Sequence, residues 1–169
     1  MCEKSYFLRP LQEKDAEYML EWLHDRTVTG HLQLNGADST LADALRFIQA
    51  AQNESVDLHR AVVDLRDTYL GTVSLKKIDL DKREAEYAIA MRASAMGTGA
   101  ALSATQDILK IAFHELKLRR VYLNVLRENQ RAIHFYDKCG FRYICQSELV
   151  LREERRNLLW YEWKIKTDI

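Results

Sequence analysis

Apolar side chains recur along this chain with the period of a helix in some stretches and the period of a strand in others. The longest helical pattern covers residues 101–116, with apolar positions three or four residues apart. Shorter stripes of the same period occupy residues 15–23 and 41–48. A fourth helix is predicted from Asn129 to Gly140, because glycine readily adopts the left-handed conformation that ends a helix. The longest stripe consists of Ala101, Leu102, Thr105, Ile108, Leu109, Ala112, Phe113 and Leu116.

The other regular stretches alternate apolar and polar residues, as half-buried strands do. They cover residues 5–10, 59–65, 69–78, 84–91, 121–125, 141–151 and 158–166. The last two form a predicted hairpin that turns through residues 153–157. The order of the elements, β-α-α-β-β-β-α-β-α-β-β, predicts an α/β (α+β) protein. Its central sheet is mixed and mostly antiparallel, with about seven strands and about four flanking helices.

The composition indicates a single compact unit. A chain of 169 residues is long enough to bury roughly two thirds of its unfolded surface. Pro10 is the only proline, and no Ser- or Gly-rich linker or repeat is present, so we expect one domain over residues 1–169. The first residues lack a signal-peptide pattern, and no apolar run approaches the ~20 residues of a membrane span. We therefore expect no membrane partner.

The charged, cysteine and histidine residues do not indicate a nucleic-acid-binding or metal-binding protein. The 25 basic and 25 acidic residues balance, so there is no bulk attraction toward nucleic acid. The cluster of basic residues at positions 117–120 is smaller than the wide basic face with stacking aromatics that nucleic-acid binding needs. The three cysteines form no C-x-x-C pair, and the five histidines have no metal-like spacing. This favours a cytoplasmic protein with reduced thiols and no metal.

The stretch from Met96 to Ala101 precedes the longest helix and carries two glycines, Gly97 and Gly99. Glycines without a Cβ let the backbone turn tightly and approach a ligand closely. A loop that opens a helix also presents unpaired N–H groups and the positive end of the helix dipole, which suits a phosphate. On its own the G-x-G-x-A pattern fits a plain turn before a core helix equally well.

A second stretch, from Asn129 to Phe141, reads N-x-x-A-x-x-F-Y-x-K-x-G-F. Together with the glycine loop it resembles the GNAT superfamily of acetyl-CoA-dependent N-acetyltransferases, over roughly residues 5 to 165. The resemblance is closest to the ribosomal-protein and amino-sugar N-acetyltransferase branch. One position departs from the pattern: Met96 stands where many members carry Arg or Gln. The loop N–H groups do not depend on that side chain, but Met96 cannot supply the extra phosphate interaction that an arginine would make.

The resemblance implies the GNAT fold and a site for acetyl-CoA. The strand end at residues 89–91 would splay from its neighbour, pair with the pantetheine arm, and polarise the thioester carbonyl through an N–H group, as an oxyanion hole does. The strand-end residues are Ile89, Ala90 and Met91. The N–H groups expected to hold the pyrophosphate belong to Gly97, Thr98, Gly99, Ala100 and Ala101.

Asn129 and Tyr136 are seven residues apart, roughly two helical turns, so they project from nearly the same face. The resemblance implies that Asn129 contacts the cofactor arm and that the Tyr136 hydroxyl faces the CoA sulfur. Tyr136 would then bind the cofactor and act as the general acid that protonates the departing thiolate. The alternative is structural: Tyr136 is a core aromatic and Asn129 is an ordinary helix N-cap.

An acceptor amine with a pKa near ~10 is mostly protonated at neutral pH, so a general base is useful. Glu86 is the candidate, directly or through water, because it alternates away from the apolar Tyr87 and Ile89. The resemblance also supports it, since the protein-acetylating branch often has a glutamate there. A solvated strand glutamate is the alternative.

These residues predict an N-acetyltransferase that moves an acetyl group from acetyl-CoA to a primary amine by direct attack. The acceptor stays open among a protein N-terminus, an amino sugar, a polyamine and an aminoglycoside, and so does a homodimer. One alternative is a non-catalytic acyl-CoA-binding regulatory module with the same fold. A nucleotide-binding oxidoreductase fits poorly, because its glycine fingerprint should directly follow a strand near the start of the chain.

Overall fold

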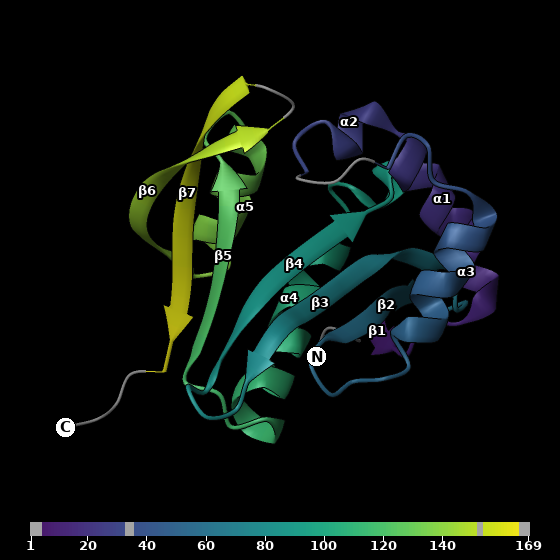
Figure 1. Cartoon of the computed structure of the whole chain (residues 1–169). Coiled ribbons are helices and arrows are strands. Elements are labelled where there is room, and N and C mark those ends of the chain that lie inside the picture. Colours follow the sequence, from purple (N-terminus) through teal and green to yellow (C-terminus); the bar gives the residue numbers. More distant parts are fainter. Residues whose placement is uncertain (1–4, 33–35, 152–153, 166–169) are drawn as a thin grey trace.

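The computed structural model describes residues 5–32, 36–151 and 154–165, which form a seven-stranded sheet with helices on both faces (Figure 1). The strands are β1 (Tyr6–Arg9), β2 (Leu58–Asp64), β3 (Tyr69–Asp79), β4 (Glu84–Met91), β5 (Arg120–Leu126), β6 (Arg142–Leu151) and β7 (Glu154–Lys164). The α-helices are α1 (Ala16–His24), α2 (Arg26–Thr29), α3 (Leu41–Ala50), α4 (Ala100–Lys110) and α5 (Gln130–Lys138). Two 3₁₀ turns and a π-helical segment complete the set: η1 (Glu13–Asp15), η2 (Ala93–Ala95) and η3 (Ile111–Glu115).

The strands follow the order β1-β2-β3-β4-β5-β7-β6, and every neighbouring pair is antiparallel except β4 and β5. The parallel pair is short: its register runs only from Glu84↔Arg120 to Glu86↔Tyr122. Beyond Glu86 the two strands separate, as the diverging teal and green arrows show in Figure 1. The sheet is therefore split into two halves that are joined at one end.

Each face of the sheet carries its own core, because successive side chains of a strand point to opposite faces. On one face α4 and α5 bury Ile108 and Ile133 against Tyr87 of β4. On the other face α1 and α3 bury Trp22 and Ile48 against β2 and β3. Three parts of the molecule surround the split between β4 and β5: α5, the start of α4, and the segment of α2 and the residues after it.

The predicted fold class is confirmed, with the seven strands and the mixed, mostly antiparallel sheet. The predicted helix over residues 101–116 is α4 continued by η3. The short helix α2, which Asp25 caps, was not predicted, because four residues show no apolar period. The turn predicted at residues 154–157 is wrong: these polar residues pair with β6 from Leu151↔Glu154 onward, and residues 153 and 166 lie outside the described residues. No helix in the described part of the chain has the length and apolarity of a membrane span.

Candidate active site

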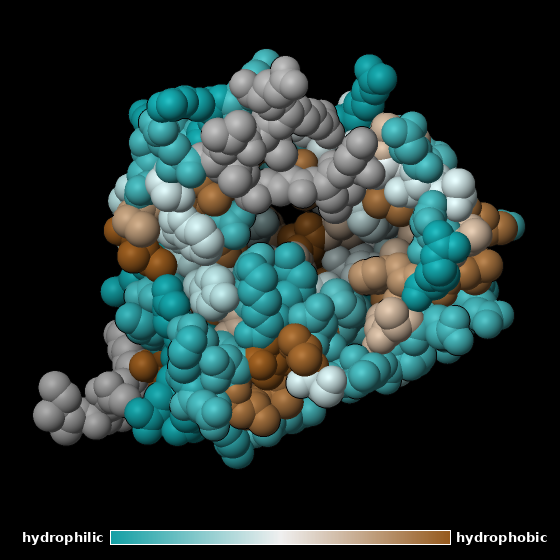
Figure 2. Space-filling view, in the orientation of Figure 1, coloured by the Kyte–Doolittle hydropathy of each residue, from teal (hydrophilic) through white to brown (hydrophobic). Residues whose placement is uncertain are grey.

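A cavity of about 670 Å³ occupies the split between β4 and β5. In the space-filling view the surface is hollowed at this place, and hydrophobic atoms are visible inside the hollow (Figure 2). The walls come from the end of β4, the glycine loop with the first turn of α4, the N-terminal half of α5, and the α1–α2 side. The cavity therefore collects segments that lie far apart in the sequence, and we call it the cleft.

The glycine loop forms one wall of the cleft. Gly97 and Gly99 have left-handed φ angles of +77° and +87°, and a Cβ built on either would meet no atom within 4 Å. Gly99 is the N-cap residue of α4 and has no capping side chain. The Ala100 N–H is taken by Thr98, but among the described residues no acceptor is found for the N–H groups of Gly97, Gly99 and Ala101, which are left for a ligand. A loop with free N–H groups, open space and the positive end of a helix dipole fits a pyrophosphate.

The five predicted loop residues do not all face the cleft. Gly97, Gly99 and Ala101 line it, whereas Thr98 and Ala100 are not among its lining residues. The Ala100 N–H donates to the Thr98 hydroxyl (3.3 Å), which in turn donates to the Ala95 carbonyl (2.6 Å). Thr98 and Ala100 thus serve the loop's own hydrogen bonds, and their predicted contacts with a cofactor stay predictions.

The end of β4 forms the floor of the cleft, because Ile89, Ala90 and Met91 all line it. On one side these residues pair with β3, from Val73↔Ile89 to Gly71↔Met91. On the other side the pairing with β5 has already ended at Glu86. The strand therefore offers a main-chain edge inside the cleft, which an extended ligand arm can join as a further strand.

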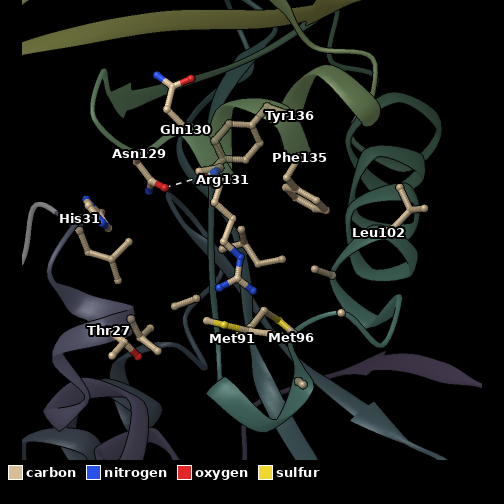
Figure 3. Close-up of a pocket in the computed structure, with 18 of the residues that line it drawn as sticks. Thr27, His31, Met91, Met96, Leu102, Asn129, Gln130, Arg131, Phe135 and Tyr136 are labelled. Carbon is tan, nitrogen blue, oxygen red and sulfur yellow. Dashed lines mark hydrogen bonds between the residues drawn. The ribbon is translucent and has the colours of Figure 1, made fainter.

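The facing wall is α5, and both of its predicted site residues line the cleft (Figure 3). The Asn129 side-chain oxygen accepts the N–H of Ala132 (3.2 Å), so Asn129 is also the N-cap of α5. The Tyr136 ring packs edge-on against Tyr87, with the ring centroids 6.0 Å apart. Within the described residues no hydrogen-bond partner is found for its hydroxyl. Burial raises the pKa of Tyr136 to about 12, so the hydroxyl is protonated at neutral pH and has a proton to donate.

Glu86 lies elsewhere. It is 7% exposed and does not line the cleft, and it alternates with Tyr87, so it points to the opposite face of the sheet from α5. Its carboxylate is 2.6 Å from the Lys77 ammonium and 3.1 Å from that of Lys76. Burial raises the pKa of Glu86, but the two lysines outweigh burial and leave the pKa below its ordinary value. The structure thus brings Tyr136 and Asn129 together and leaves Glu86 apart.

Among the cleft residues that the sequence patterns did not predict is Arg131 of α5. Its side chain reaches from α5 into the cleft toward Met91 and Met96 (Figure 3). No ion pair with Arg131 is found among the described residues. A cation in the first turn of a helix is disfavoured by the helix dipole. Its unfavourable position two residues after the predicted helix start at Asn129 is the signal that was available in the sequence.

On the α1–α2 side, the cleft is lined by Thr27, Val28, His31 and Leu32, with Glu128 across from them at the start of α5. The Glu128 carboxylate accepts a hydrogen bond from Arg156 (3.0 Å). A hydrogen bond from its own backbone N–H, followed by the bond from Arg156, lowers the pKa of Glu128, so the carboxylate is ionised at neutral pH. The one carboxylate among these lining residues, Glu128, is thus paired with a cation from outside the cleft.

Comparison with known proteins identifies the family. Residues 6–142 match the model described as acetyltransferase (GNAT) domain. The chain is 32% identical over 89 residues to the spermidine N(1)-acetyltransferase of Vibrio cholerae, covering 53% of this chain and about half (51%) of that relative. It is 28% identical over 139 residues to the Escherichia coli K12 spermidine N(1)-acetyltransferase, covering 79% and 71% of the two chains.

Solved structures agree on the fold. The spermidine N-acetyltransferase of Vibrio cholerae in complex with CoA and spermine superposes with a TM-score of 0.85 at 20% identity, over 95% of both chains. A GNAT-family acetyltransferase from Bacillus anthracis superposes with a TM-score of 0.84, also at 20% identity and over 95% of both chains. The matched model covers well over half of the sequence. The chain therefore belongs to the GNAT family of acetyltransferases, enzymes that take their acetyl group from acetyl-CoA.

Proposed function

We propose that this enzyme transfers the acetyl group of acetyl-CoA to a primary amine by direct attack of the amine on the thioester. The observation that carries the proposal is the cleft between β4 and β5. It joins a phosphate-binding glycine loop, a free strand edge and a protonated tyrosine hydroxyl in one cavity. We further propose that residues 1–169 form a single acetyltransferase domain.

The donor would be held at three places along the cleft. The N–H groups of Gly97, Gly99 and Ala101 bind the pyrophosphate at the start of α4. Arg131 adds a cation from the opposite wall, which compensates for the uncharged side chain of Met96. The pantetheine arm lies along the free edge of β4, next to Asn129.

The chemistry needs few groups from the protein. Acetyl-CoA supplies the thioester, and a main-chain N–H of residues 89–91 stabilises the negative charge on its carbonyl oxygen. The bond from the amine nitrogen to the carbonyl carbon forms as the carbon–sulfur bond breaks. Tyr136 donates its proton to the departing sulfur. The ammonium form of the acceptor loses one proton to a base or to solvent before it attacks. The nitrogen loses a second proton as the amide forms, and this proton replaces the one that Tyr136 gave to sulfur, so that the products are the amide and the CoA thiol.

Two observations weigh against Glu86 as the general base. The lowered pKa of Glu86 makes it a weak proton acceptor at neutral pH, and it faces away from Tyr136. Its burial is at odds with a solvated strand glutamate, and its ion pairs with Lys76 and Lys77 support a structural role, in which Glu86 fastens β4 to β3. Glu86 as general base, acting through water, stays a prediction, which a pH–rate profile decides.

We propose a polyamine such as spermidine as the acceptor class. The named activity of the relatives supports it. At the α1–α2 side of the cleft the Glu128 carboxylate, paired with Arg156 through one oxygen, offers its other oxygen to an ammonium group. The family resemblance predicted the ribosomal-protein and amino-sugar branch, whereas the relatives that match are named spermidine N(1)-acetyltransferases. Protein N-termini and amino sugars therefore belong on the same panel as competing acceptors. A homodimer and a cytoplasmic location also stay predictions.

The test combines thiol release with mass spectrometry. Purified protein, acetyl-CoA and one amine at a time are assayed for free CoA and for a product that is heavier by one acetyl group. We expect both with spermidine. Binding of acetyl-CoA without turnover on any amine of the panel would contradict the proposed transfer, and acetylation of another amine alone would replace the polyamine assignment.

A further inference from the structure

The glycine loop has two faces. Gly97 and Gly99 line the cleft, whereas Thr98 lines a second cavity of about 340 Å³ on the other side of the loop. Tyr6 of β1 lies on the wall of this second cavity, together with Leu70 and Ala95. The loop thus separates the cleft from this second cavity.

One long-range contact fixes the orientation of a peptide group in the loop. The Tyr6 hydroxyl donates to the Thr98 carbonyl oxygen (3.0 Å), across 92 residues of sequence. Tyr6 is itself held in the sheet by its register with Asp64 of β2. Among the described residues, no second donor to the Thr98 carbonyl is found. The half-buried ring of Tyr6 therefore connects a strand at the edge of the sheet to the tip of the loop.

The orientation of this carbonyl determines where the next N–H points. A trans peptide is planar, and its C=O and N–H bonds point in opposite directions. Because the Thr98 carbonyl points at Tyr6 behind the loop, the Gly99 N–H points away from Tyr6 and toward the cleft. Glycine accepts a wide range of φ angles, so this peptide can flip when nothing holds it. A flipped peptide would place a carbonyl oxygen where a phosphate has to bind.

We propose that Tyr6 is a positioning residue for the acetyl donor. Its hydrogen bond holds the Thr98–Gly99 peptide in the orientation that presents the Gly99 N–H to the pyrophosphate. This inference rests on the proposed function, because it assumes that the cleft binds acetyl-CoA. Tyr6, on β1, would thereby affect the affinity for acetyl-CoA at the glycine loop before α4.

The test is Tyr6→Phe, which retains the ring and removes only the donor. Binding is measured by calorimetry with two ligands: CoA, and pantetheine, which has no pyrophosphate. We expect the affinity for CoA to fall about 2- to 10-fold, the scale of one hydrogen bond, while the affinity for pantetheine is unchanged. In turnover, the KM for acetyl-CoA should rise by a similar factor, with kcat at saturating acetyl-CoA unchanged.

The matched control is Tyr143→Phe, which removes the hydroxyl of a tyrosine that is 56% exposed on β6 and does not line either cavity. It should leave both affinities unchanged. A folded Tyr6→Phe protein with wild-type affinity for CoA would overturn the inference, and so would an equal loss for CoA and pantetheine. Failure of the wild-type protein to bind CoA at all is a different result, which removes the proposed function and the role of Tyr6 with it.

Discussion

Replacing Gly99 with alanine separates two effects that a glycine can have. Gly99 has a φ angle of +87°, and a Cβ at this position meets nothing within 4 Å. The substitution Gly99→Ala therefore creates no clash inside the protein, and its effect on stability is the cost of a left-handed alanine, about 1–2 kcal/mol. The same Cβ enters the space assigned to the pyrophosphate, so the affinity for CoA should fall by roughly tenfold or more, which is about 1.4 kcal/mol per factor of ten.

Gly140 provides the matched control. Its φ angle is +89°, and a Cβ there would lie 3.3 Å from the Trp163 indole nitrogen, outside the cleft. Urea unfolding should show that Gly99→Ala and Gly140→Ala lose comparable stability, with Gly140→Ala losing somewhat more because of the tight contact. Calorimetry with CoA should show a loss of affinity for Gly99→Ala alone. Equal affinity losses in both variants, or none in Gly99→Ala, would refute the placement of the pyrophosphate at the loop.

Three further predictions concern charged residues. Arg131→Met should weaken CoA binding several-fold, because it removes a cation from the cleft. Adding Met96→Arg to that variant should restore part of the affinity. An unchanged dissociation constant in Arg131→Met would mean that Arg131 does not contact the donor. Glu86→Gln should lower turnover most at neutral pH if Glu86 is the base, with a gap that closes as the acceptor's own pKa is approached, whereas parallel pH–rate profiles would leave it structural. Because the folded pKa of Glu86 is lowered, its ion pairs stabilise the protein above the ordinary glutamate pKa, and this stabilisation disappears as the pH falls through the folded value. Unfolding midpoints of Glu86→Gln should therefore fall below wild type at neutral pH and converge with it in acid; a constant difference would contradict the pairing.

Local patterns of apolar and polar residues predict much of the fold. The apolar stripe of residues 101–116 predicts α4 and its continuation, since its 3.6-residue period extends over several turns. The split between β4 and β5 is not encoded in such a pattern. Residues 84–91 alternate regularly along the whole strand, and nothing in them marks Glu86 as the last paired position. The splay was expected only from the family resemblance.

The candidate site likewise contains residues that local spacing predicts and contacts that it does not predict. Asn129 and Tyr136 share one helix face, so their spacing alone brings them to one cavity. The partners of Glu86 depend on a bulge in β3, where Lys77 takes a left-handed φ of 51° and its side chain meets the carboxylate. The contact of Tyr6 with Thr98 spans two distant segments. Neither leaves a local sequence signal, because each depends on how remote elements pack.

The most direct test of acetyl transfer in this cleft is the turnover of Tyr136→Phe beside that of the wild-type protein. Both are measured with acetyl-CoA and an acceptor that the wild type acetylates, and the affinity for CoA is measured in parallel. We predict that kcat falls by roughly 10²-fold, the scale of general acid catalysis, while the dissociation constant for CoA stays within about twofold. Wild-type turnover in a folded Tyr136→Phe protein would contradict the account, because another group would then protonate the thiolate.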